Sequence, residues 1–285
     1  MSLSKIAILG PGLLGGSVAL ALRQRSPGCH IALWGRREAA VEEVRACGVA
    51  DTASTEWQPV VEGADVILFC VPIGVMPTLA EQILPWVKPG ALVTDVGSAK
   101  ASVVESLAPI FFGKARFIGS HPMAGSEQSG LAAARADLFE GAVCILTPHA
   151  DVSAKTVADV QAFWELLGCN IRTLGPEEHD DVICLVSHLP HLLAAVLVDF
   201  VCAENPNSVN FCGNGFRDTT RVASGPAEMW TEIFAFNRAA LGRQLEGLIA
   251  RLQEVSRMVA SRNDVKMNEL LLNAKIQRDR LKRGN

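Results

Sequence analysis

The chain contains no tyrosine, to which we assign no function, and it lacks the features that mark several classes of protein. Its eight cysteines include no CxxC pair and no spacing typical of metal ligands, so we expect reduced thiols and no metal site. A net charge of −4 excludes attraction of the whole molecule to nucleic acid or to an anionic membrane. No signal-peptide pattern precedes the first expected strand, which favours a cytoplasmic protein.

The sequence also lacks a clean membrane-spanning run. The longest apolar stretch, residues 182–202, contains His188, Pro190, His191 and Asp199. Polar and charged side chains are costly in hydrocarbon, so this stretch favours a helix buried inside the protein or at a subunit interface.

What the chain does have is enough apolar sequence for two domains, with 285 residues of which 49% are hydrophobic. Up to residue 175, expected strands alternate with helices, which predicts an α/β Rossmann-type domain with a doubly wound, mainly parallel sheet. The expected strands cover residues 5–9, 30–34, 66–70, 91–95, 116–119, 143–146 and 170–174, and clear helices cover 76–87, 101–109 and 154–167.

Residues 176–285 read as an all-helical domain for substrate binding and dimerisation. Apolar residues recur there at alternate spacings of four and three: Leu241, Leu245, Leu248, Leu252, Val255 and Val259. This stripe predicts a packing face in a helical bundle, and we expect a homodimer formed through the helical domain. A cleft between the two domains is the expected position of the site.

The amino terminus carries a dinucleotide-binding pattern, in which an apolar strand leads into Gly10-Pro11-Gly12-Leu13-Leu14-Gly15 and then a helix. Gly10 permits a tight turn, Gly12 lets backbone approach a pyrophosphate, and Gly15 lets helix and strand pack closely. The amides at the start of the helix, around Leu13 and Leu14, would face the phosphates. The alternative is a strand-to-helix turn that merely requires glycine.

The end of the second expected strand favours NADP. Gly35 stands where an NAD site would place Asp or Glu on the ribose, and Arg36 and Arg37 follow it. Guanidinium groups bind phosphate through paired hydrogen bonds, which suits a 2′-phosphate. NAD stays possible, because both arginines could simply begin a solvated helix.

The segment GSHPMAGSEQSG, residues 119–130, presents a candidate catalytic histidine. His121 precedes a proline, which holds it extended, and we expect the ring to be presented in a loop at the carboxyl end of a strand. Its ordinary pKa near 6.5 allows it to take or give a proton near neutrality.

Arg217, in the segment Gly213 to Arg221, is the expected substrate anchor, because its guanidinium could hold a carboxylate by two hydrogen bonds. Pairing of Arg217 or Arg221 with Asp218 is equally compatible with the sequence. His188 and His191 could be interior histidines bonded to backbone carbonyls.

Together these motifs resemble the prephenate/arogenate dehydrogenase family of tyrosine biosynthesis. The resemblance covers nearly the whole chain and includes GPGLLGGS, CVPI, TDVGSAK, GSHPMAGSEQSG, SHLPH, GFRDTTR and EMWTEIF, in the family's order. It implies a Rossmann domain, a helical dimerisation domain and oxidative decarboxylation of prephenate to 4-hydroxyphenylpyruvate with hydride transfer to NADP or NAD.

The resemblance also implies residue roles. His121 matches the catalytic histidine and Ser98 a serine between the substrate hydroxyl and the cofactor. Arg217 matches the arginine that binds a substrate carboxylate. Further positions match the lining of the substrate pocket, His191, Ser126, Glu127 and Trp230, or the pyrophosphate turn, Gly10, Gly12 and Gly15. We also expect Leu13, Leu14, Arg36, Arg37, Val71 and Pro72 in the cofactor site, although Gly35-Arg36-Arg37 departs from the acidic NAD pattern of many prephenate-type members.

Three alternatives stay open. His191 and Glu127 resemble the prephenate-using branch, but Glu127 could also attract the ammonium of arogenate, so arogenate or dual specificity is an alternative. Another NADP-linked oxidoreductase would be expected to place a catalytic lysine after the domain boundary, and residues 176–225 contain none. A non-catalytic NADP-binding sensor would not need His121, Ser98 and Arg217 together.

Overall fold

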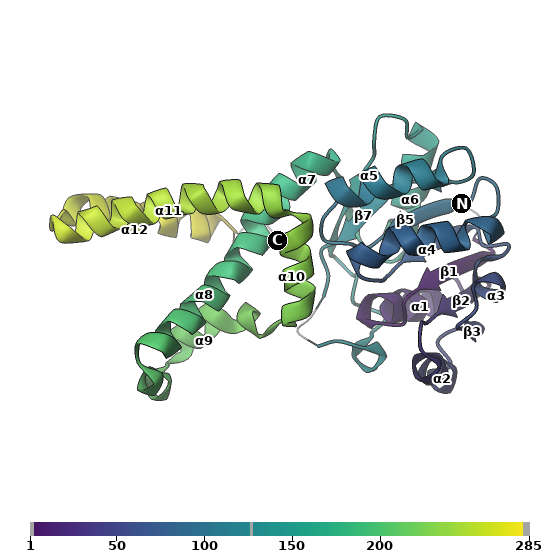
Figure 1. The fold of residues 1–285 in the computed structure, drawn as a ribbon, viewed down its shortest axis with the longest axis horizontal. Coiled ribbons are helices and arrows are strands. Elements are labelled where there is room, and N and C mark those ends of the chain that lie inside the picture. The colour runs from purple at the N-terminus through teal and green to yellow at the C-terminus, as the bar shows by residue number, and fades with distance from the viewer. Residues whose placement is uncertain (1–2, 126–127, 282–285) are drawn as a thin grey trace. The chain divides into compact units, whose positions relative to one another are not determined.

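The computed structural model describes residues 3–125 and 128–281, which form two compact units. The first unit ends at Arg238 and contains the β-sheets and helices α1 to α10 (Figure 1). The second begins at Ala239 and contains most of α11 (Arg238–Ala260) and all of α12 (Asp264–Leu281). The expected division by role, at residue 175, stays a prediction.

The main sheet has the predicted doubly wound, parallel form. Within the described residues its strand order is β3-β2-β1-β4-β5-β6, and all neighbouring pairs are parallel. Sheets with this strand order bind dinucleotides across the carboxyl ends of their strands. The strands are β1 (Lys5–Leu9), β2 (His30–Trp34), β3 (Thr52–Ser54), β4 (Val66–Phe69), β5 (Leu92–Asp95) and β6 (Arg116–Phe117).

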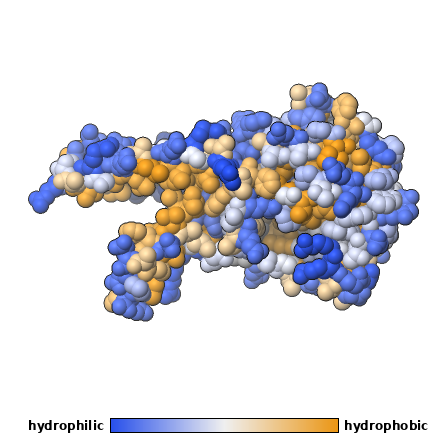
Figure 2. Space-filling view, viewed as in Figure 1, coloured by the Kyte–Doolittle hydropathy of each residue, from blue (hydrophilic) through white to orange (hydrophobic). Residues whose placement is uncertain are grey.

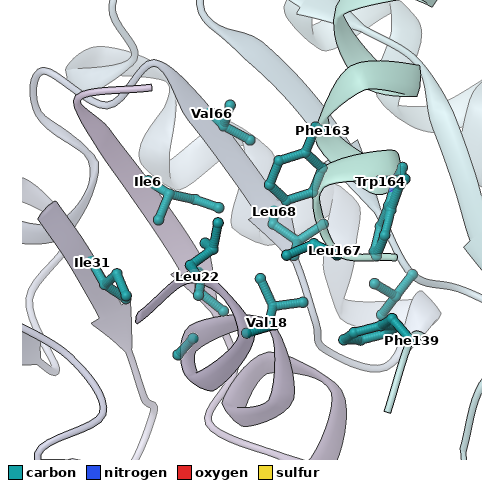
Figure 3. Packing of buried hydrophobic residues seen from close by; sticks show 14 of the residues in the cluster. Ile6, Val18, Leu22, Ile31, Val66, Leu68, Phe139, Phe163, Trp164 and Leu167 are labelled. Atoms are coloured by element: carbon teal, nitrogen blue, oxygen red, sulfur yellow. The ribbon is translucent and has the colours of Figure 1, made fainter. Parts of the chain in front are cut away.

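Alternate residues of the strands enter two apolar cores, one on each face of the sheet. Ile6 and Ile8 of β1 lie in the core with Val18 and Leu22 of α1 and Trp164 of α6 (Figure 3). On the opposite face, a second core is formed by residues that include Ala7, Leu9, Ile67, Ile83 and Leu107. The rigid strand ends that result can hold loops in fixed positions.

The candidate histidine belongs to a second, smaller sheet. The expected strand 116–119 is divided, because β7 (Gly119–Pro122) leaves the main sheet and pairs antiparallel with β8 (Val143–Thr147). β8 pairs parallel with β9 (Asn170–Thr173). His121 therefore lies within strand β7, opposite Ile145, and the expectation of a loop position was wrong.

The helices around the sheets agree with the sequence pattern except at some ends. The predicted helix 76–87 stops at Ile83 and continues as a 3-10 turn over Leu84–Trp86, where Pro85 has no amide hydrogen to donate. The short strand β3 was not predicted. The helices are α1 (Leu13–Arg25), α2 (Glu38–Cys47), α3 (Trp57–Val61), α4 (Met76–Ile83), α5 (Ala101–Phe111) and α6 (Ala154–Leu166), with 3-10 turns η1 (Ile73–Val75) and η3 (Leu131–Ala133).

A run of helices completes the first unit. One continuous helical stretch consists of α7 (Pro176–Ile183), a π-helical segment (Cys184–His188) and α8 (Leu189–Glu204). This stretch is long and apolar enough to cross a membrane by length and composition alone. After it come η5 (Pro206–Phe211), α9 (Asn214–Thr220), η6 (Arg221–Ser224) and α10 (Ala227–Phe236).

The membrane interpretation does not suit this stretch, because several polar side chains along it have buried partners in the protein. His179 and Asp180 are buried and hydrogen-bonded to each other and to other elements, and His188 is 1% exposed. The polar side chains of the stretch therefore lie inside the protein, whereas apolar side chains such as Val196 and Phe200 are exposed, and burial at a subunit interface stays a prediction.

The leucine stripe predicted from the sequence lies on α11, in the second unit. Its six apolar positions fall within Arg238–Ala260, and two of them, Leu252 and Val259, are 54% and 65% exposed. An apolar stripe with this exposure is a packing face that the single chain does not fully cover.

Candidate active site

The predicted cofactor residues lie in loops that follow parallel strands at one edge of the main sheet. The glycine turn follows β1, Arg36 and Arg37 follow β2, and Val71 and Pro72 follow β4. Because parallel strands present their carboxyl ends on the same edge, the structure brings these segments together at the edge where such sheets bind ligands.

The glycine turn has the geometry of a dinucleotide site. Gly10 has a φ of +121°, and a Cβ there would lie 2.3 Å from the backbone oxygen of Cys70. A Cβ at Gly15 would lie 2.1 Å from the backbone oxygen of Gly10, so close packing also requires that glycine. A Cβ at Gly12 would meet nothing within 4 Å, which leaves open space before α1 for a phosphate. Leu13 and Leu14 open α1 and are half-buried.

The end of β2 adjoins this turn. A Cβ at Gly35 would lie 3.2 Å from the ring of Pro11, and the exposed Arg36 and Arg37 follow immediately. The structure therefore places two guanidinium-bearing residues next to the glycine turn, with glycine where an acidic residue would serve NAD.

His121 begins a chain of hydrogen bonds that reaches the amino end of α5. Its Nδ1 lies 2.9 Å from Nε2 of His179, and Nδ1 of His179 lies 2.8 Å from Oδ1 of Asp180. The carboxylate of Asp180 also accepts from the backbone amides of Lys100 (2.7 Å) and Ala101 (3.0 Å). Asp180 is thus an N-cap for α5 that is supplied by a distant segment.

The hydrogen-bond chain assigns the tautomers. An ionised carboxylate only accepts, so the neutral ring of His179 carries its hydrogen on Nδ1 and accepts at Nε2. His121 must then donate from Nδ1. This arrangement leaves Nε2 of His121 with a lone pair, which is the form needed for a base.

Burial keeps this pair of rings neutral. His121 is 6% exposed, which contradicts the expectation of a presented ring. Burial, followed by the nearby His179, Lys100 and His188, holds the pKa of His121 well below 6.5. Burial also lowers the pKa of His179, although its hydrogen bond to Asp180 acts in the opposite direction.

A buried ion pair fixes the turn that carries Ser98. The ammonium of Lys100 pairs with the carboxylate of Asp95 at the end of β5, and both side chains are fully buried. Lys100 Nζ also donates to the carbonyl of Ser120 at 3.0 Å, and the amide of Ser120 donates to Asp95 at 3.1 Å. Ser98 is half-buried and stands between Asp95 and Lys100 in the sequence, and His121 directly follows Ser120. The same network of buried bonds therefore holds both candidate residues.

A second cluster joins α8 to α10. The rings of His191 and Trp230 stack with centroids 3.5 Å apart and planes at 12°. A Cβ at Gly225 would lie 2.5 Å from Trp230 Nε1 and 3.3 Å from His191 Cε1, so the stack requires glycine at that position. Nδ1 of His191 and Nε2 of His188 are buried, and neither has a hydrogen-bond partner among the residues that the structure describes.

Asn237 connects the second cluster to the first. Its side-chain amide donates to the carbonyl of Asp180 at 2.8 Å and contacts Nδ1 of His188 at 3.1 Å. Because the amide nitrogen can only donate, His188 accepts at Nδ1 and carries its hydrogen on Nε2. Burial lowers the pKa of His188 to about 4, so the ring is neutral.

The π-helical segment explains why His179 and His191 serve neighbouring clusters. They are 12 positions apart (191 − 179), which in an unbroken α-helix would separate them by roughly 120° around the axis. The π turn over Cys184–His188 accommodates one extra residue, which brings the separation to roughly 20°. Both rings therefore project from nearly the same face.

Arg217 lies inside helix α9 and is exposed. Arg221 is one turn further on, at the start of η6, which packs against α8 and ends next to Gly225. Within the described residues, no hydrogen bond joins Arg217 to His121 or His191. Ser126 and Glu127 lie outside the described residues.

Sequence reasoning missed His179, Asp180 and Asn237. His179 and Asp180 stand in the polar start of a helix, PEEHDD, where charged residues are ordinarily solvated. Asn237 follows α10 without any motif. Their partners in other elements are 49 to 80 residues away in the sequence, so no local pattern could have indicated those contacts.

The strand order and the glycine turn define a dinucleotide-binding protein of the Rossmann type, with a buried imidazole beside the cofactor edge. The family described as "Prephenate dehydrogenase, nucleotide-binding domain" matches residues 18–173, and "Prephenate dehydrogenase, dimerization domain" matches residues 175–273. The chain belongs to the prephenate dehydrogenase family, as its motifs predicted.

Individual relatives agree with this placement. The cyclohexadienyl dehydrogenase of Zymomonas mobilis is 34% identical over 90% of this chain and 89% of its own length. The prephenate dehydrogenase of Bacillus subtilis is 33% identical over 97% of this chain and 76% of its own length. Among solved structures, prephenate dehydrogenase of Aquifex aeolicus with hydroxyphenyl propionate and NAD+ has a TM-score of 0.92 and 29% identity, with 99% of both chains covered. Arogenate dehydrogenase of Synechocystis has a TM-score of 0.84 and 29% identity, with 97% of this chain and 99% of that chain covered.

Proposed function

We propose that this protein catalyses the oxidative decarboxylation of prephenate to 4-hydroxyphenylpyruvate in tyrosine biosynthesis. The observation that carries the proposal is the hydrogen-bond chain from Asp180 through His179 to His121, which prepares an imidazole as a base in a chain that also has a dinucleotide-type glycine turn. A bound nicotinamide dinucleotide would supply the hydride acceptor.

His121 is the proposed general base. Its Nε2 would accept the proton of the substrate's ring hydroxyl, while Nδ1 keeps its hydrogen bond to His179. The carboxylate of Asp180, held by two backbone amides, would stabilise the imidazolium that forms. Ser98 is proposed to position the hydroxyl, and loss of CO2 makes the product aromatic, so the step runs in one direction.

The residues at the sheet edge fit the cofactor. We propose that the amides around Gly12, Leu13 and Leu14 hold the pyrophosphate, with Val71 and Pro72 lining the site. Arg36 and Arg37 support NADP as the preferred form, because they follow Gly35 against the glycine turn. Steady-state kinetics with both cofactors tests this preference, and a markedly higher kcat/KM with NAD would contradict it.

The proposed substrate pocket contains the stacked rings of His191 and Trp230, with Ser126 and Glu127 as further expected members. Nδ1 of His191, which has no partner within the described part of the chain, supports a polar contact to substrate. Arg217 is the proposed carboxylate anchor by its motif. Arg221 is the second candidate, because η6 carries it into the turn that ends at Gly225, against the stack.

The anchor is tested by two matched variants, Arg217→Ala and Arg221→Ala. Loss of the anchor should raise KM roughly 10- to 100-fold, since a hydrogen bond to a charged group contributes about 1.5–3 kcal/mol. The variant of the other arginine should resemble the wild type in KM. An unchanged KM in both variants would remove the anchor from this segment.

Prephenate is the proposed substrate, and arogenate or dual specificity is the alternative. The relatives support both, because one is named a cyclohexadienyl dehydrogenase and one solved neighbour an arogenate dehydrogenase. The ratio of kcat/KM for the two acids, followed by the absorbance of the reduced nicotinamide, decides between them. Absence of turnover with both acids would favour a non-catalytic NADP-binding sensor.

We also propose a cytoplasmic homodimer, with residues 1–175 as the cofactor domain and 176–285 as the substrate and dimerisation domain. Exposed apolar side chains on α8 support the dimer (Figure 2). They include Leu193, Val196, Leu197 and Phe200, with Val196 54% and Phe200 59% exposed. A monomeric mass in light scattering at micromolar concentration would contradict this part of the proposal.

A further inference from the structure

One hydrogen bond joins the helix of the substrate pocket to the loop after β4. Oε1 of Glu232, in α10, accepts from the backbone amide of Gly74 at 2.9 Å. Gly74 lies in η1, which runs directly into α4, so its amide is among those that a helical start leaves without an internal partner. A carboxylate is also favoured there by the helix dipole.

The approach of the two segments depends on the absence of a side chain at Gly74. A Cβ there would lie 3.1 Å from Oε1 of Glu232 and 3.5 Å from the ring of Phe236. Gly74 does not have a positive φ, so its backbone conformation alone does not require glycine. The close approach of α10 is therefore the structural reason for this glycine.

The loop on one side of this contact belongs to the cofactor edge. Val71 and Pro72 precede η1 directly, at the carboxyl end of β4. Any shift of this loop on binding a dinucleotide would move the amide of Gly74, which is two residues beyond Pro72.

Helix α10, on the other side, belongs to the substrate pocket. Trp230, two residues before Glu232, stacks on His191, and Asn237 directly after the helix donates to the carbonyl of Asp180. The same short helix thus touches the cofactor loop, the stacked rings and the support of His121.

We propose that Glu232 is a positioning residue that couples dinucleotide binding to substrate binding through α10. A dinucleotide that fixes the Val71–Pro72 loop fixes Gly74, which holds α10 and the ring of Trp230 in the geometry that receives the aromatic acid. The coupling is reciprocal, so the acid tightens the dinucleotide by the same factor. This inference rests on the proposed assignment of the two binding sites.

A purely structural role for Glu232 makes a different prediction. Loss of one exposed hydrogen bond would lower the melting temperature slightly. It would leave unchanged the ratio of the substrate affinities measured with and without dinucleotide. The ratio of substrate affinities with and without dinucleotide therefore separates positioning from simple stabilisation.

The test uses the full chain and hydroxyphenyl propionate as the aromatic acid, with binding measured by calorimetry with and without saturating NADP+ or NAD+. For the wild type we expect the dinucleotide to tighten binding of the acid about 10-fold, within the usual range for coupled sites. In Glu232→Ala the factor should fall below about 2-fold, while the affinity without dinucleotide is retained. Gly74→Ala should have the same effect from the other side of the contact.

Two further variants serve as controls. Glu228→Ala removes an exposed carboxylate one turn earlier on α10 and should keep the wild-type factor. Glu232→Gln keeps an oxygen acceptor without the charge, so it should fold normally and show an intermediate factor.

The inference is overturned if Glu232→Ala keeps the full coupling or if the wild type shows none. Those outcomes leave the proposed function intact, because both ligands still bind. If neither ligand binds the wild type, the proposed function fails and the inference fails with it.

Discussion

The protein contains two histidine clusters that differ in how completely their polar atoms are paired. In the first cluster, His121, His179 and Asp180 form a continuous chain that ends on two backbone amides. In the second cluster, one nitrogen of His188 and one of His191 are buried with no hydrogen-bond partner in residues 3–125 and 128–281, although Trp230 packs against both rings.

The difference indicates two kinds of task. A paired network fixes the orientation and tautomer of a ring, which suits a group that must handle a proton. A buried polar atom without a partner costs about 1–3 kcal/mol, so it suits a position that a polar ligand completes. We therefore expect substitutions in the first cluster to act on kcat and substitutions in the second to act on KM.

The largest expected effect comes from His121→Asn. Loss of the base should reduce kcat by ~10²–10⁴-fold with KM comparatively unchanged, because general-base help is lost while the binding contacts remain. Steady-state kinetics with prephenate measures both constants. A kcat within a few fold of the wild type would show that this cluster does not handle the proton.

Asp180→Ala should reduce kcat roughly tenfold, the factor that corresponds to 1.36 kcal/mol of transition-state stabilisation. It should also lower the free energy of unfolding by about 0.5–2 kcal/mol, since α5 loses its cap. Urea unfolding and kinetics check the two effects. Asp180→Asn keeps an oxygen acceptor and should recover part of the rate. Glu177 is exposed on α7, the helix that carries Asp180, and Glu177→Ala should change neither the rate nor the stability.

His191→Asn should raise KM for the aromatic acid by roughly 5- to 10-fold, the loss of a hydrogen bond worth about 1 kcal/mol. The value of kcat should stay within about threefold, because the His121 chain is untouched. Kinetics at saturating cofactor gives both constants, with His30→Asn, exposed at the start of β2, as the control. A fall in kcat without a change in KM would erase the distinction between the clusters.

The pH dependence is the smallest expected effect near neutrality. Burial holds the pKa of His121 well below 6.5, so the base stays deprotonated and kcat/KM should be flat from pH 7.5 to below 6.5. An acid limb with its midpoint at or above 6.5 would contradict a buried, neutral ring.

Stability should depend on pH in the same range with a defined sign. The histidines of the unfolded chain titrate near 6.5, whereas burial lowers the pKa of His188 to about 4 and also that of His121 and His179. Below pH 6.5 the unfolded chain therefore binds more protons, and stability falls as pH decreases toward 4. Unfolding at pH 7 and pH 5 should differ by up to about 1.4 kcal/mol per pH unit for each ring, and equal stabilities would refute the assignment.

Much of the fold was predictable because its signals are local. The spacing of apolar residues predicted the strands of the parallel sheet except β3, and the glycines of the turn after β1 have the conformations that the pattern required. The division of strand 116–119 was not predictable, because it follows from the pairing of β7 with β8, which lies more than 20 residues further on. That pairing is what moves His121 from an expected loop into a buried strand.

The sequence alone determined which chemical groups are available: a glycine turn for a dinucleotide, a histidine before a proline, and arginines within the helical segment. Only the tertiary structure decided how they act, because His179 and Asp180 reach His121 and α5 across 58 to 80 positions of sequence. Local backbone preferences specify turns and helices, whereas the tautomer and burial of a ring depend on neighbours that only the folded chain brings together.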